Sequence, residues 1–126
     1  VNYSMTMKIT VNKEDKFTVL KPEIEKLDST VAPLVKAEIV LVTGNGERNI
    51  IIDLADVRYI DSSGLSALLV ANRSCKSLNG AFVLTGLNEN VRKLISISQL
   101  DTILTITPTY SEAVDFVIMD DIQKSL

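Results

Sequence analysis

The fold of this chain is indicated most clearly by residues 50–65, which read IIIDLADVRYIDSSGL. The segment opens with the continuous apolar run 50–52, and Leu54 follows Asp53. A strand with one face in water alternates apolar and polar residues, whereas an uninterrupted apolar run is typical of a central strand covered on both faces. We therefore predict a strand here with helices above and below the sheet, followed by a helix from about Ser62.

Two shorter strands are predicted on the N-terminal side of this run. Residues 5–11 alternate apolar and polar side chains, which is the period of a strand with one buried face. Residues 12–16 are mostly polar and predict a turn, and residues 17–20 predict a second strand. Pro22 has no N–H to donate, so this strand should end there or lie near a sheet edge. Together the two strands predict a β-hairpin.

A helix is predicted after this hairpin. A cap at Thr30 places Pro33 in the first turn, where the missing N–H removes no intrahelical bond. Its apolar stripe, at three- and four-residue steps, consists of Val31, Leu34, Val35, Ile39 and Val42. The β-branched run 39–43 also fits a strand, so the end of the helix stays open between two interpretations. Residues 44–46 end the element under either interpretation.

The next segments alternate helix and strand. The helix that begins near Ser62 should reach Leu78 and end at Asn79 and Gly80. Its predicted inward side chains are Leu65, Leu68, Leu69, Asn72, Cys75 and Leu78. Residues 81–85 predict another buried strand.

Two further helices flank a last strand. Asn88 is a suitable cap for the first of them. The inward residues of that helix are Val91, Leu94, Ile95 and Ser98. Residues 102–107 predict the last strand, before Pro108. Thr109 and Glu112 then have the spacing of a capping box. The final helix should bury Ala113, Val114, Val117 and Ile118.

These elements predict an α/β fold, because strands and helices alternate after the first hairpin. We expect a mostly parallel mixed sheet of about five strands with about four helices packed on it. A length of 126 residues with 46% hydrophobic content is enough for one core. We therefore expect residues 1–126 to form a single domain with its core at about residues 5–119.

Composition excludes several classes of function. The 13 Lys and Arg against 16 Asp and Glu leave a net charge of -3, which gives no basic surface for nucleic acid. With no His and one Cys, the chain lacks the groups for a His-based triad, a Cys/His zinc site or an internal disulfide. We expect no metal and no cofactor, and we interpret Cys75 as a small buried hydrophobe.

Membrane association is not expected either. No apolar run approaches the roughly 18 to 20 residues that a membrane span needs, because Lys36 and Glu38 interrupt the best candidate. Residues 1–10 lack the charged and apolar regions of a signal peptide. We therefore expect a soluble, cytoplasmic protein.

Polar side chains gather in the loop after the central strand. If Asp61 caps the helix, Ser62 and Ser63 occupy its first turn beside unpaired backbone N–H groups. Ile60 and Leu65 then have the spacing of a hydrophobic staple. A helix start of this kind accommodates a phosphate, either on a ligand or attached to a serine. The same residues are also ordinary capping chemistry, and the pattern alone leaves these interpretations open.

This loop resembles the signature of the STAS domain family, the anti-sigma factor antagonists. The matching residues in and around the loop are Asp53, Leu54, Val57, Tyr59, Ile60, Asp61, Ser62, Ser63, Gly64 and Leu65. Matches farther away are Leu27, Asp28, Thr30, Gly86, Leu87 and residues 108–113. The similarity covers about residues 5–119 in the family's element order, and it implies a STAS-like domain.

The resemblance implies a protein-binding switch without catalysis of its own, and thus no enzyme. Members similar to this chain bind an anti-sigma factor that is also an ATP-dependent serine kinase, and so free a sigma factor for transcription. The resemblance places the serine phosphorylated by that kinase at Ser62, and a PP2C-type phosphatase reverses the modification. The partner-binding residues that it implies are Asp28, Asp61, Ser62, Ser63 and Gly64.

One departure from the family pattern precedes the first helix. Family members commonly carry a Gly just before the Leu and Asp of this segment, whereas this chain has Lys26. The preceding residues 22–25 are charged and include a proline. The departure indicates either a partner other than the usual kinase or variation between lineages.

Two other functions compete with this interpretation. Asp53 ends the central strand, where a receiver domain carries its phosphate acceptor. That chemistry needs a magnesium site with an acidic pair after the first strand, and a Lys after the last parallel strand. Glu14 and Asp15 instead lie in the predicted hairpin turn, and the last strand ends in Thr107 and Pro108. The other alternative is a STAS subunit of a transport or stress-sensing complex that is not phosphorylated.

Overall fold

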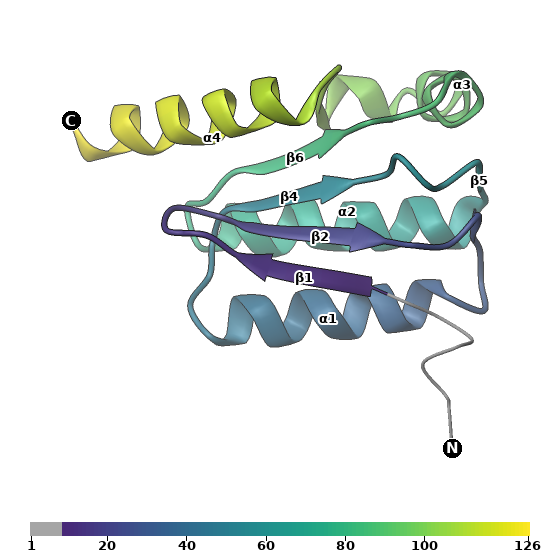
Figure 1. Cartoon of the computed structure of the whole chain (residues 1–126), viewed down its shortest axis with the longest axis horizontal. Helices are drawn as coiled ribbons and strands as arrows, with labels where there is room; N and C mark the ends of the chain where they lie inside the picture. The colour runs from purple at the N-terminus through teal and green to yellow at the C-terminus, as the bar shows by residue number, and fades with distance from the viewer. Residues whose placement is uncertain (1–8) are drawn as a thin grey trace.

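The structure, a computed structural model that describes residues 9–126, contains a mixed sheet with the strand order β1-β2-β4-β6-β7 (Figure 1). Its strands are β1 (Ile9–Lys13), β2 (Thr18–Pro22), β4 (Ile50–Asp53), β6 (Phe82–Thr85) and β7 (Thr105–Thr107). The α-helices of this part of the chain are α1 (Ala32–Gly44), α2 (Ser62–Ser77), α3 (Glu89–Ile97) and α4 (Tyr110–Ser125). Only β1 runs antiparallel to its neighbour, so the predicted α/β class with a mostly parallel sheet is confirmed. None of these helices is long and apolar enough to cross a membrane.

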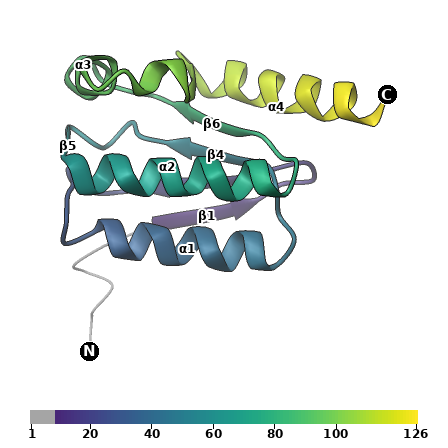
Figure 2. The same cartoon turned by 180° about the vertical axis from the view of Figure 1, so that it is seen from behind.

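The central strand β4 contributes to two separate apolar clusters. Ile50 and Ile52 belong to a cluster with residues of α1, α2 and α3, whereas Ile51 packs with Ala113 and Val117 of α4. All three isoleucines are fully buried. Both views show α1 and α2 side by side along the sheet (Figures 1 and 2). The continuous apolar run therefore corresponds to a strand covered on both faces, as predicted.

The β1–β2 hairpin is longer than its sequence pattern indicates. Asn12 and Lys13, predicted in the turn, continue β1 and pair with β2, so the turn is confined to residues 14–17. These polar side chains are compatible with a strand because β1 is at the sheet edge and both are exposed. Residues 5–8 of the predicted first strand lie outside the described residues. β2 ends at Pro22, as predicted.

Helix α1 begins differently from its prediction. Its N-cap residue is Val31, and no side chain caps the first turn. The backbone N–H and hydroxyl of Thr30 donate instead to Asp28 Oδ1 at 3.0 and 2.6 Å. The Asp28 carbonyl oxygen accepts from Ala32 N at 2.8 Å. The predicted Thr30 cap is therefore wrong, because Asp28 organises this turn, while Pro33 lies in the first turn as predicted.

The remainder of α1 decides between the two interpretations of its C-terminal half. Residues 39–43 are helical, so the strand interpretation is wrong, and the helix ends at Gly44. Leu34 is 46% exposed rather than part of the core. Ala32 occupies the core side of the first turn in its place.

Helix α2 ends as its sequence predicts. Asn79 has a left-handed φ of 60°. Gly80 N donates to Cys75 O at 2.8 Å and Asn79 N donates to Lys76 O at 2.9 Å, which is the Schellman pattern. Leu78, predicted to face inward, is 40% exposed. The buried side of α2 carries Gly64, Ala67, Leu68, Ala71, Asn72 and Cys75.

The capping signals of the last two helices are confirmed. Asn88 Oδ1 accepts at 2.8 Å from the backbone N–H three residues later, at the start of α3. The Thr109 hydroxyl accepts from Glu112 N at 3.2 Å and donates to Glu112 Oε1 at 2.9 Å, at the start of α4. The predicted strand 102–107 is shorter, because a 3₁₀ turn at Leu100–Thr102 precedes β7.

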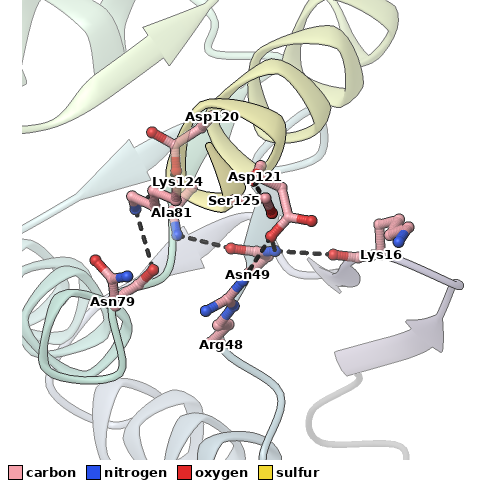
Figure 3. A network of polar contacts seen from close by, with 9 residues as sticks. All are labelled: Lys16, Arg48, Asn49, Asn79, Ala81, Asp120, Asp121, Lys124 and Ser125. Atoms are coloured by element: carbon pink, nitrogen blue, oxygen red, sulfur yellow. Dashed lines mark hydrogen bonds and ion pairs between the residues drawn. The ribbon is translucent and has the colours of Figure 1, made fainter.

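A buried amide connects the N-terminal ends of the strands to one another and to α4 (Figure 3). Asn49, which is 6% exposed, accepts from Ala81 N at 2.8 Å and donates to Lys16 O at 3.0 Å. Asp121 of α4 accepts from Arg48 at 2.8 Å, and this hydrogen bond lowers the pKa of Asp121. The partners are between 32 and 73 residues apart, so no local pattern in the sequence predicts the network.

We expect Asn49→Ala to lower the free energy of unfolding by about 2 to 4 kcal/mol, because the buried Ala81 N–H and the Lys16 carbonyl oxygen both lose their partner. Urea unfolding followed by circular dichroism measures the loss. Asn90→Ala is the matched control: the exposed Asn90 amide donates to Arg58 O at 3.2 Å, and its removal should cost less than about 1 kcal/mol. Equal losses in both variants would contradict the role given to Asn49.

Candidate functional site

Two strands of two residues each, which the sequence analysis missed, bring the candidate site together. β3 (Lys26–Leu27) and β5 (Tyr59–Ile60) pair in parallel, residue for residue. Two residues are too few to show a periodic pattern, which is why neither strand was predicted. Asp28 and Asp61 directly follow the paired strands. The register therefore places both aspartates at the same end of this small sheet.

Asp61 caps α2, as predicted. Its Oδ1 accepts from Gly64 N at 3.0 Å, and its carbonyl oxygen accepts from Leu65 N at 2.9 Å. The N–H of Asp61 donates to Leu27 O at 3.3 Å. Ile60 is buried, and Leu65 packs partly buried against the same apolar cluster, as a hydrophobic staple requires. The start of α2 is thus fixed by hydrogen bonds on its polar side and by packing on its apolar side.

Gly64 is required by a close approach between α2 and β3. A Cβ at this position would overlap the Leu27 carbonyl oxygen and would lie 2.6 Å from Ile60 Cγ1. Both neighbours belong to residues of the β3–β5 pair, and the Leu27 oxygen is a backbone atom of that pair. Gly64 is itself buried, so it lies beneath the site and sets the distance between α2 and β3.

Ser62 is exposed at the rim of a shallow hollow between α1 and α2, whereas Ser63 is half-buried. The hollow has a volume of about 250 Å³ and is lined by Ser29, Ala32, Pro33, Lys36, Ser62, Ser63 and Ser66. Within the described part of the chain, the Ser62 hydroxyl has no hydrogen-bond partner. Of the two predicted serines, Ser62 therefore has the more accessible oxygen.

Asp28 lies next to this hollow, since Ser29 is among the lining residues. Hydrogen bonds from Thr30 to its carboxylate, with a smaller contribution from the charge of Lys26, hold the pKa of Asp28 below its ordinary value. Asp28 is partly exposed and is anionic at neutral pH. Both predicted aspartates and both predicted serines thus gather where β3 and β5 lead into α1 and α2.

The outward face of α1 continues from the hollow as an apolar surface. Its residues are Pro33, Leu34, Ala37, Val40, Leu41 and Gly44. Leu34, Val40 and Leu41 are 46%, 63% and 61% exposed. A helix at the surface of a globular protein normally carries polar residues on this side, whereas α1 is apolar on both sides. This surface was not predicted, although the low proportion of polar residues between 31 and 44 indicates it.

Two other candidates have structural roles. Asp53 Oδ1 accepts from Ala55 N at 3.0 Å and so stabilises the turn after β4. Cys75 is buried, and this burial raises the pKa of its thiol to about 12, which fits a small hydrophobe rather than a reactive group. Among residues 9–126, no three His, Cys, Asp or Glu side chains are close enough together to hold a metal ion.

Comparison with known proteins connects this geometry to one family. The model of the STAS domain family matches residues 8–113. A Thermotoga neapolitana homologue of TM1081, named as a candidate anti-sigma factor antagonist, is 39% identical over 70 residues, which are 56% of this chain and 62% of the relative. BtrV of Bordetella bronchiseptica, named in the same way, is 30% identical over 92 residues, which are 73% of this chain and 78% of BtrV.

Solved structures give the same result. The crystal structure of TM1081 from Thermotoga maritima, a candidate anti-sigma factor antagonist, superimposes with a TM-score of 0.81 at 31% identity, over 86% of this chain and 93% of that one. The sequence match to the Thermotoga neapolitana relative is shorter and covers less than two thirds of its length.

We expect Gly64→Ala to lower the free energy of unfolding by about 1 to 3 kcal/mol, because the added methyl group forces α2 away from β3. Chemical denaturation measures the change. Gly44→Ala is the matched control, since a Cβ there meets nothing within 4 Å, and it should leave stability unchanged or raise it by up to about 1 kcal/mol. A Gly64→Ala protein as stable as the Gly44→Ala protein would show that the close approach is not needed.

Proposed function

This chain belongs to the STAS domain family, and we propose that it acts as an anti-sigma factor antagonist. In this role it binds an anti-sigma factor in the cytoplasm and thereby frees a sigma factor for transcription. The observation that carries the proposal is the exposed hydroxyl of Ser62 at a rigid helix start, next to Asp28 and to the outward face of α1.

The proposed docking surface combines polar and apolar groups. Asp28, Asp61, Ser62 and Ser63 provide charges and hydrogen-bonding groups around the hollow. The outward face of α1 provides apolar area that a partner would remove from water, which is the main favourable contribution to protein association. Gly64 contributes indirectly, because it fixes the position of the two serines.

We propose that phosphorylation of Ser62 switches this surface off. The anti-sigma factor, acting as an ATP-dependent serine kinase, transfers the phosphoryl group to the Ser62 oxygen, and a PP2C-type phosphatase removes it. The phosphate adds about 1.5 to 2 negative charges at neutral pH. These charges lie beside Asp61 and would lose water in any interface that covers the loop. A penalty of about 2 to 3 kcal/mol weakens binding by roughly 30- to 150-fold.

The proposed role needs no catalysis by this chain. The carboxylates of Asp28, Asp53 and Asp61 each accept a hydrogen bond from a nearby backbone N–H. Their geometry is that of turns and caps, which favours a binding module over an enzyme and gives no support to phosphoryl transfer to Asp53.

We expect Ser62→Ala to bind the anti-sigma factor as tightly as the unmodified protein does and to resist phosphorylation. Ser62→Asp should bind about 30- to 150-fold more weakly, because the added carboxylate opposes docking. Calorimetric titration against the purified anti-sigma factor measures both affinities, and mass spectrometry after incubation with ATP detects the phosphate.

Ser63→Ala is the control for this experiment, since it removes the neighbouring hydroxyl and leaves Ser62 in place. It should still gain one phosphate. Equal affinities for Ser62→Ala and Ser62→Asp would refute the switch. Tight binding without any phosphorylation would favour a STAS subunit of a complex that phosphorylation does not regulate.

A further inference from the structure

Lys36 occupies a position in the hollow that the proposed function leaves unexplained. It is half-buried on α1 and lines the same hollow as Ser62, Ser63 and Ser66. The other lining residues are neutral. Within residues 9–126, Lys36 has no ion-pair partner. A half-buried lysine that lines a hollow together with four serines and has no ion-pair partner is suited to an anion.

The carboxylates near the hollow are already engaged. Asp61 accepts from Gly64 N at the start of α2, and Asp28 accepts from Thr30 before α1. Both repel a phosphate. Lys26 also lies in this region, but it is exposed on β3 and acts on Asp28. Among the residues that line the hollow, Lys36 is the one with a positive charge to oppose a new negative charge on Ser62.

We infer that Lys36 anchors the phosphate of phosphorylated Ser62 in the hollow between α1 and α2. This inference rests on the proposed phosphorylation of Ser62. The phosphate forms an ion pair with the Lys36 ammonium group, and the neighbouring serine hydroxyls can donate hydrogen bonds to its remaining oxygens. About 10 to 15 Å³ is enough for one enclosed water molecule, so the hollow of about 250 Å³ has room for a phosphate.

The anchored phosphate opposes docking at the edge of the outward apolar face of α1. Pro33 lines the hollow and also begins the outward apolar face of α1. A phosphate held by Lys36 therefore brings its hydration shell to the edge of that face, and a partner has to displace this water to dock. Lys36 is a positioning residue in this scheme, because it fixes the location of the charge and takes no part in phosphoryl transfer.

The test uses the full chain with phosphoserine placed at position 62 by chemical synthesis, so that no kinase is needed. Titration of the ³¹P signal with pH gives the second pKa of the phosphate. A nearby ammonium group stabilises the dianion, so this pKa should be about 0.2 to 0.7 pH units lower with Lys36 than in Lys36→Gln. Lys36→Arg should retain the low value, and 1 M salt should reduce the difference.

Lys76→Gln is the matched control. Lys76 is exposed in the last turn of α2, about 21 Å along the helix from Ser62 and beyond the screening length at physiological salt. In the Lys76→Gln protein, the phosphate on Ser62 should have the same second pKa as in the unaltered chain. Equal pKa values with and without Lys36, or the same change in Lys76→Gln, would overturn the inference. Either result leaves the kinase reaction untouched, whereas a kinase that ignores Ser62 would overturn the proposed function and not this ion pair.

Discussion

The contact between Gly64 and the Leu27 carbonyl oxygen constrains the rest of the site. Helix α2 approaches β3 closely because position 64 has no side chain. The same carbonyl oxygen accepts a hydrogen bond from Asp61 N. One backbone group of β3 therefore contacts both the N-cap residue of α2 and its first turn. The parallel pairing of β3 with β5 keeps that group in place. Ser62, the first residue of α2, is exposed at the surface above this framework.

A rigid base beneath an exposed hydroxyl suits regulation by charge. The carboxylates of Asp28 and Asp61 already accept hydrogen bonds from nearby backbone N–H groups, so the turns that they organise do not depend on the Ser62 hydroxyl. Helix α1 has two roles, one on each of its faces. Its inner face belongs to the core with α2, and its outer face is apolar and open to a partner. Lys36 lines the hollow beside Ser62, where it would connect the proposed modification to the proposed docking surface.

Much of the fold could be predicted from the sequence because its signals are local. The run 50–52 identified the central strand, and the Asp61 cap lies within one turn of the groups that it binds. The misplaced features depend on longer contacts, on very short segments or on a choice between neighbouring turn residues. Asp28 replaced Thr30 as the organiser of the turn before α1, because its side chain accepts from Thr30 and its backbone carbonyl accepts from Ala32 N. Strands β3 and β5 are too short to show a period, and Asn49 bonds to segments more than 30 residues away. The sequence therefore named Asp28, Asp61, Ser62 and Ser63 as candidate site residues, but it did not predict the β3–β5 framework that positions them.

The central claim is that negative charge at Ser62 changes the surface without changing the fold. Two-dimensional ¹H–¹⁵N NMR of the chain with and without phosphoserine at position 62 tests it directly. The account predicts amide shift changes confined to residues near 28–36 and 60–66, with the peaks of the sheet and of α4 unmoved. Shift changes throughout β2, β4 and β6, or a loss of peak dispersion, would contradict it.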